Sequence, residues 1–284
     1  MARTKLDTRS IGLDIGLAFS RWLTGKENLH YGLWDGLEVC AANVGAAQEA
    51  YTAKLFDLLP DGPLRILDIG GGAGETAKKL IALGHTVEIV VPSAFLGERC
   101  RANAPTAVVH EATFQQSDPQ GPFDLCIFSE SFQYIPLRDG LPRCIDLLKP
   151  GGHILIADCF RSEGFSPDKV RATVGGGHGI AAFLSFLADL PLTIQHEEDI
   201  TASVAPSIDV EQGLFNVVGY GLTRVDQQMQ AQRPRLRGLA HWILRRVLGP
   251  RKRARLDQRL NQQTRTAAAF TANNTYLMLR LQKT

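Results

Sequence analysis

The 284-residue chain contains no uninterrupted apolar run close to the roughly 20 residues that a membrane-spanning helix needs. Its first segment, Met1 to Asp7, also lacks the apolar core of an export signal. Lysine and arginine number 31 against 29 aspartates and glutamates, and the formal net charge of +2 does not argue for a nucleic-acid partner. These absences favour a globular protein of the cytoplasm.

Cysteine is scarce as well, and its arrangement argues against two kinds of site. The five cysteines are scattered, and no two of them form a CxxC pair: Cys40, Cys100, Cys126, Cys144 and Cys159. An odd number of dispersed cysteines is typical of reduced, mostly buried thiols in a cytoplasmic protein. No group of histidine, cysteine and aspartate has metal-ligand spacing, so we expect no bound metal.

Glycine, by contrast, is concentrated directly after an apolar run. Residues 64–69 have the pattern of a strand and residues 76–83 that of a helix, and four of the residues between them are Gly70, Gly71, Gly72 and Gly74. In α/β proteins a strand, a glycine turn and a helix bind nucleotide-like ligands, because glycine lets the backbone approach the ligand closely. The N–H groups that start the helix favour an anionic group.

Strand and helix patterns continue to alternate along the chain. Strands are predicted at 64–69, 86–91, 107–110, 124–129, 153–158, 192–197 and 275–282. This alternation predicts an α/β, Rossmann-like sheet of seven mostly parallel strands with helices on both faces. We divide the chain into a helical cap (1–60), the Rossmann-like core (61–160), a substrate cap with a basic helical insertion (161–274) and the final core strand (275–284).

Three motifs in this region point to one family. Asp68 and the glycines after it, D-x-G-x-G-x-G, resemble motif I of class I S-adenosylmethionine-dependent methyltransferases. Residues 123–130 (FDLCIFSE) and 147–152 (LLKPGG) resemble the same family's fourth-strand segment and the turn before its fifth strand. Residues 72–77 also satisfy G-x-G-x-x-A, a weak dinucleotide-binding signal, and a turn without a ligand is the simplest alternative. The order and spacing of all three motifs favour the methyltransferases.

The resemblance implies S-adenosylmethionine as cofactor and assigns contacts to it. The methionine end would lie against Asp68, Gly70, Gly71, Gly72 and Gly74. Where the family usually has an acid for the ribose hydroxyls, this chain has Val91, so Ser93 or a water would replace it, and the lost acceptor costs on the order of 1–3 kcal/mol.

The adenine site implied by the resemblance follows the third strand. Residues 111–114 are similar to the family's adenine clamp. Glu111 would accept from the adenine amino group and Phe114 would pack on the ring, with Ala112 and Thr113 between them. An exposed loop acid is the alternative for Glu111.

Three side chains are candidates for the chemistry. Ser129 and Glu130 end the fourth strand and are expected to face the reactive methyl group, where a carboxylate stabilises positive charge or accepts a proton. Residues 30–34 (HYGLW) resemble a loop of sterol, tocopherol and cyclopropane fatty-acid methyltransferases in which the tyrosine lies near the cofactor. We therefore assign His30 and Tyr31 as further candidates. A helix-start role for Glu130 and simple packing of Tyr31 are the alternatives.

The second half of the chain carries the substrate signals. Residues 197–201 (EEDIT) resemble lipid, sterol and tocopherol methyltransferases, which implies a small, lipid-like or isoprenoid-derived acceptor. Residues 233–259 hold ten lysines and arginines and one acid, and residues 236–248 have one apolar stripe flanked by arginines. A basic amphipathic helix of this kind suits peripheral contact with an anionic membrane. A helix docked on the domain is the alternative, and no motif supports nucleic acid.

The sequence thus predicts a methyltransferase that moves the sulfonium methyl group to a small hydrophobic or lipid-like acceptor. The protein would mainly position the reactants and exclude water. Two alternatives stay open: a non-catalytic scaffold, suggested by Val91, and a non-methylating enzyme such as a cyclase that uses the same cofactor.

Overall fold

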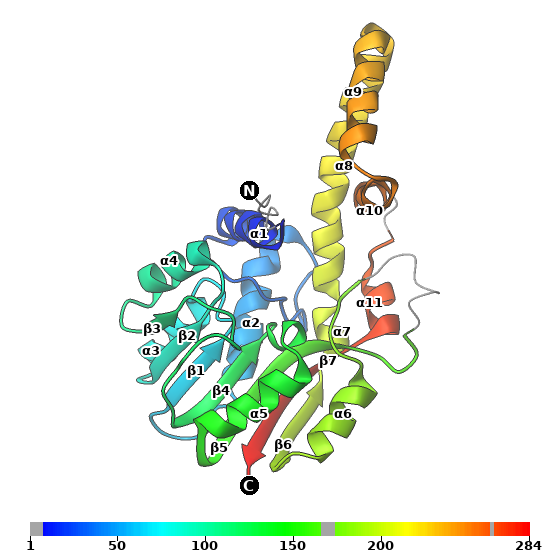
Figure 1. Ribbon diagram of the computed structural model, residues 1–284. Coiled ribbons are helices and arrows are strands. Elements are labelled where there is room, and N and C mark those ends of the chain that lie inside the picture. The colour runs from blue at the N-terminus through cyan, green and yellow to red at the C-terminus, as the bar shows by residue number, and fades with distance from the viewer. Residues whose placement is uncertain (1–7, 166–173, 262–263) are drawn as a thin grey trace, which may run out of the picture.

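The computed structural model describes residues 8–165, 174–261 and 264–284, and one seven-stranded sheet lies at its centre (Figure 1). The strands are β1 (Arg65–Ile69), β2 (Thr86–Val90), β3 (Val108–His110), β4 (Phe123–Ser129), β5 (Leu148–Arg161), β6 (Leu192–Asp199) and β7 (Asn274–Lys283). Their order across the sheet is β3-β2-β1-β4-β5-β7-β6. The first five are parallel, and β7 runs antiparallel between β5 and β6. The predicted fold class is confirmed.

Helices cover both faces of the sheet. They are α1 (Thr8–Thr24), α2 (Val44–Phe56), α3 (Glu75–Ala82), α4 (Ala94–Asn103), α5 (Leu137–Leu147), α6 (Ile180–Ala188), α7 (Thr201–Val204), α8 (Pro206–Gln232), α9 (Pro234–Val247), α10 (Pro250–Leu260) and α11 (Ala267–Asn273), with short 3-10 turns at Ala41–Asn43 (η1) and Phe132–Tyr134 (η2). Within the described ranges, no helix combines the length and apolarity required to traverse a bilayer.

The core consists of two apolar layers, one on each face of the sheet. Successive residues of a strand point to opposite faces. Ile66 therefore packs in the layer that contains Tyr51 of α2 and Leu80 of α3, whereas Leu67 packs in the layer that contains Leu141 of α5 and Phe183 of α6. Because both faces are buried, the strands have nearly continuous apolar sequences. α2 belongs to this core although it lies in the segment that the sequence analysis assigned to a separate cap. The division between cap and core at residue 60 stays a prediction.

The elements differ from the expected ones mainly in extent. β5 continues to Arg161 because it pairs with β7 from His153 onward. The single helix expected at 236–248 is α9, flanked by α8 and α10, and α8 and α9 stand out from the body of the molecule (Figure 1). The substrate cap expected at 161–274 includes residues 166–173 and 262–263, which lie outside the described residues.

Candidate functional site

The glycine turn lies between β1 and α3 and has a backbone conformation that requires glycine. Gly70 and Gly72 have φ of 79° and 56°, in the left-handed region that other residues rarely adopt. A Cβ on Gly71 would lie 2.6 Å from Oδ2 of Asp68. The turn therefore keeps side chains away from the space above the end of β1.

Asp68 is the most unusual group in this turn. It is 1% exposed, and its Oδ2 has no hydrogen-bond partner among the described residues. Burial raises the pKa of Asp68 to about 7. A buried carboxyl oxygen without a donor is costly, so the site favours a ligand that brings a donor or a positive charge.

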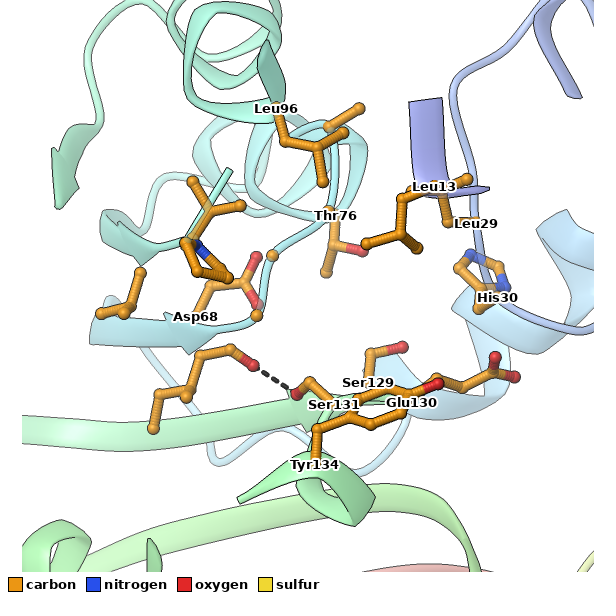
Figure 2. Close-up of a pocket in the computed structure, with 18 of the residues that line it drawn as sticks. Leu13, Leu29, His30, Asp68, Thr76, Leu96, Ser129, Glu130, Ser131 and Tyr134 are labelled. Atoms are coloured by element: carbon orange, nitrogen blue, oxygen red, sulfur yellow. Dashed lines mark hydrogen bonds between the residues drawn. The ribbon is translucent and has the colours of Figure 1, made fainter. Parts of the chain in front are cut away.

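Asp68 borders a cavity of about 260 Å³, shown in Figure 2. Apolar walls surround a few polar groups, an arrangement typical of small-molecule sites. Figure 2 shows Asp68 on one side of this cavity and His30 and Glu130 on the other. The lining also comprises Leu13, residues 27–29, residues 69–73, Glu75, Thr76, residues 90–92, Leu96, residues 113–115, Ser129, Ser131, Tyr134 and Ile135.

Most of the residues expected from the sequence meet at this cavity. Those in its lining are His30, Asp68, Gly70, Gly71, Gly72, Thr113, Phe114, Ser129 and Glu130. They come from four separate segments, three of which lie at or after the carboxyl ends of the parallel strands β1, β3 and β4. Five expected residues are not in the lining: Tyr31, Gly74, Ser93, Glu111 and Ala112.

The residues outside the lining have structural partners. Gly74 starts α3, and a Cβ there would lie 3.0 Å from Cα of Cys100. Ser93 caps α4 and accepts from the backbone N–H of Leu96. Glu111 pairs with Arg101 of α4. The adenine role of Glu111 and the ribose role of Ser93 stay predictions. Neither residue belongs to the lining of the cavity.

Val91 itself offers no hydrogen-bond acceptor side chain at the position that the resemblance assigns to the ribose. Val91 is buried in the cavity wall, and Glu88, the acid of β2, pairs with Arg65 at 2.7 Å and His110 at 2.8 Å. The sequence analysis assigned no role to several polar lining residues, among them Asn28 and Thr76. Asn28 is buried and its Nδ2 has no partner among the described residues, and Thr76 lies in the first turn of α3. Their local sequence contains no motif that marks them.

Glu130 follows β4 and has a strained backbone with φ of 58°, a conformation that is enriched at functional sites. Its Oε1 accepts from the backbone N–H of Tyr31 at 2.7 Å and from the hydroxyl of Tyr276 at 3.0 Å. Burial raises the pKa of Glu130 to about 8, although both bonds act in the opposite direction. Among the described residues, no group donates to Oε2. Glu130 is therefore a carboxyl group with one fixed and one available oxygen.

Tyr276 extends this contact into a buried network. Its hydroxyl lies 2.7 Å from that of Tyr51, which lies 3.4 Å from Oγ of Ser129. Burial raises the pKa of both tyrosines well above the usual value, so they stay protonated donors. The position of Glu130 is thus held from α2 and β7, two elements far apart in the sequence.

His30 and Tyr31 occupy different environments. Nδ1 of His30 lies 2.8 Å from the carbonyl oxygen of Tyr31, and its ring stacks on Tyr51 at 4.5 Å. Burial lowers the pKa of His30 to about 4, so it is neutral at pH 7. The Tyr31 ring packs against Phe270 and Tyr276, and only its backbone meets Glu130. His178 lies 3.0 Å from the carbonyl oxygen of Ile135.

Sequence comparisons match the part of the chain that carries most of this lining to a known family. Residues 44–172 match a family model described as a methyltransferase domain. An uncharacterized methyltransferase of Anoxybacillus flavithermus is 29% identical over 97 residues, which are 33% of this chain and 46% of that protein. The match thus spans about half the length of this curated relative.

Solved structures share the fold over nearly the whole chain. A cyclopropane synthase from Mycobacterium tuberculosis is 14% identical with a TM-score of 0.69, over 99% of this chain and 100% of that one. Geranyl diphosphate C-methyltransferase from Streptomyces coelicolor, crystallised with S-adenosyl-L-homocysteine, is 14% identical with a TM-score of 0.63, over 100% of both chains. The cyclase SpnF is 16% identical with a TM-score of 0.63, over 96% and 95%. At these identities the likeness concerns the fold alone.

Proposed function

We propose that this chain, which carries a class I S-adenosylmethionine-dependent methyltransferase domain, transfers a methyl group to a small hydrophobic or lipid-like acceptor. The observation that carries the proposal is Oδ2 of Asp68, which lies beside the glycine turn and has no hydrogen-bond partner in the described part of the chain. S-adenosylmethionine has a cationic amino group that can donate to such an oxygen. When bound, the cofactor supplies an electrophilic methyl group.

The cavity residues fit that cofactor without the usual ribose acid. Asp68 and the backbone of Gly70 and Gly72 would hold its amino-acid end, and Phe114 offers an aromatic wall. At the ribose, the side chain of Val91 accepts no hydrogen bond, and polar lining groups such as Thr76 and Asn28 could contribute. We therefore expect a functional site with a cofactor affinity lowered by the missing acid.

Glu130 is the proposed proton acceptor. Its Oε1 is held by Tyr31 and Tyr276, so Oε2 is the oxygen that would take a proton from the acceptor. With a pKa of about 8, Glu130 holds a proton at neutral pH and becomes a base as the pH rises through 8. His30, neutral with a pKa of about 4, is a weaker candidate and is proposed to orient the loop around Tyr31.

The acceptor class rests on the apolar lining and on the EEDIT segment at residues 197–201. Geranyl diphosphate C-methyltransferase from Streptomyces coelicolor, a structural neighbour, was also crystallised with geranyl diphosphate. Because the cyclase SpnF has the same fold, the alternative of a non-methylating enzyme also has a specific observation in its favour. The cytoplasmic location stays a prediction.

One experiment separates these functions. Purified protein is incubated with methyl-labelled cofactor and a cell extract, and the small molecules are then searched by mass spectrometry for a gained methyl group. We expect a labelled apolar product and stoichiometric S-adenosylhomocysteine. A small molecule that is converted without gaining a methyl group, with no S-adenosylhomocysteine formed, would indicate a cyclase. If titration calorimetry detects no binding of the cofactor at millimolar concentration, the scaffold alternative replaces the proposal.

A further inference from the structure

The outer half of α8 and all of α9 form a helical finger (residues 217–247) that extends away from the sheet (Figure 1). None of the 14 residues of α9 is buried, and the last buried residue of α8 is Gly219. The finger therefore contributes nothing to the two core layers. A helix of this length without core contacts requires another reason for its apolar residues.

The finger exposes large apolar side chains on both helices. Tyr220 of α8 is 70% exposed, and Trp242 and Val247 of α9 are 56% and 72% exposed. The other exposed large apolar residues of the finger are Val217, Val218, Leu222, Val225, Leu236, Leu239, Ile243 and Leu244. So many exposed apolar residues on one projecting element indicate a surface that binds a protein or a membrane.

The two helices are nevertheless fixed against each other. Asp226 of α8 binds Arg237 of α9 through two bonds of 2.8 Å and His241 through one of 2.8 Å. At the base, Gln212 of α8 donates to the backbone carbonyl of Arg259 in α10 at 2.9 Å. The finger is thus an organised element, and its apolar surface is presented in a defined arrangement.

The positive charge of the finger and α10 indicates which kind of partner they bind. Residues 233–259 contain ten basic residues and one acid, Asp257. Within the described part of the chain, none of the exposed cations in the following set forms an ion pair: Arg235, Arg245, Arg246, Arg251, Lys252 and Arg255. A second copy of the finger would bring like charges together, whereas an anionic lipid surface offers opposite charge and an apolar interior at once.

We propose that the finger, together with α10, docks on a bilayer of anionic phospholipids. Trp242 and the leucines of α9 enter the boundary between headgroups and acyl chains, and the arginines contact the phosphates. The helix that carries the finger, α8, starts beside the loop that contains His30 and Tyr31, because Ser207 at its base accepts from the backbone of Gly32 and from Trp34 Nε1 at 2.8 Å. This inference does not depend on the proposed methyl transfer.

The test is co-sedimentation of the full chain with phosphatidylcholine vesicles, with and without phosphatidylglycerol. We expect binding only with phosphatidylglycerol, and weaker binding in high salt. The double variant Arg245→Gln with Arg251→Gln should lower the partition coefficient about 30-fold, which corresponds to about 1 kcal/mol for each cation. The matched control, Lys78→Gln with Arg138→Gln, removes the same charge from exposed positions outside the finger and should bind as the wild type does.

A second measurement tests the apolar contact. Trp242 fluorescence should shift to the blue on binding and be quenched by brominated lipid, and the variant Trp242→Phe should lose both signals, although Trp22 and Trp34 remain. If the Arg245→Gln, Arg251→Gln variant and its control lost vesicle binding to the same extent, the proposal would be overturned. So would dimers in sedimentation equilibrium with no vesicle binding, which would assign the finger to a second copy, or retention by an oligonucleotide with none by vesicles.

Discussion

Asp68 provides the sharpest test of the site, because its environment makes opposite predictions for the free and the liganded protein. The change is Asp68→Asn, which keeps the shape and removes the charge. In the folded protein the pKa of Asp68 rises from 3.8 to about 7 through burial. At 1.36 kcal/mol for each unit, the ionised form costs the fold about 4 kcal/mol above pH 7. A buried asparagine without partners costs about 1–3 kcal/mol.

Because burial raises the pKa of this acid in the folded state, Asp68 leaves the stability of the fold unaffected below pH 3.8. The fold then loses stability as the pH rises from 3.8 to 7. Asp68→Asn should therefore stabilise the cofactor-free protein by about 1–3 kcal/mol at pH 8. Between pH 8 and pH 5 that advantage should shrink by about 2–3 kcal/mol, since the wild type regains a proton. Urea denaturation at both pH values measures this difference.

The same variant should bind S-adenosylmethionine more weakly, by about 10- to 150-fold, because it loses a charge-assisted hydrogen bond of about 1.5–3 kcal/mol. Titration calorimetry measures the affinity. Asp158→Asn is the matched control: Asp158 is also buried with a pKa near 7, but it accepts from Gln133 and Cys159 and lies outside the cavity lining. An equal stability gap at pH 5 and pH 8, or unchanged affinity in Asp68→Asn, would refute the reasoning.

The other predictions concern neighbours of the cavity. Glu130→Gln keeps the acceptor for Tyr31 and Tyr276 but takes no proton, so turnover should fall by about 10²- to 10⁴-fold with cofactor affinity nearly unchanged; wild-type turnover would remove Glu130 from the chemistry. Tyr276→Phe removes a bond that lowers the pKa of Glu130, so the rising limb of the pH–rate profile should move above pH 8; an unshifted limb would contradict the coupling. Glu111→Ala should change cofactor affinity less than about threefold in calorimetry, because Glu111 pairs with Arg101 outside the cavity; a tenfold loss would restore its adenine role.

The sheet and the glycine turn were predictable because their signals are local. A buried strand such as β1 has a continuous apolar sequence, and left-handed positions such as Gly70 and Gly72 require glycine. The side-chain partners of the site were less predictable. A residue can be placed at the right loop and still point elsewhere, as Tyr31 does, or satisfy a helix end, as Ser93 does.

Contacts between distant segments left no mark in the sequence. The bond from Tyr276 to Glu130 joins residues 146 positions apart, and no spacing rule relates them. For the same reason the periodic pattern in residues 236–248 predicted a helix but not that α9 would project with α8, since amphipathicity alone does not say which body covers the apolar stripe.

The position of β7 between β5 and β6 has a consequence for how the protein is made. Among the described strands, β6 pairs only with β7, and Tyr276 of β7 donates to Glu130. During synthesis the ribosome must therefore complete α8 to α11 before the sheet can close, and a nascent chain that ends ahead of residue 274 should expose β6 to protease. The finger emerges from the ribosome while the sheet is still open, so it becomes available to a surface earlier than the site becomes competent.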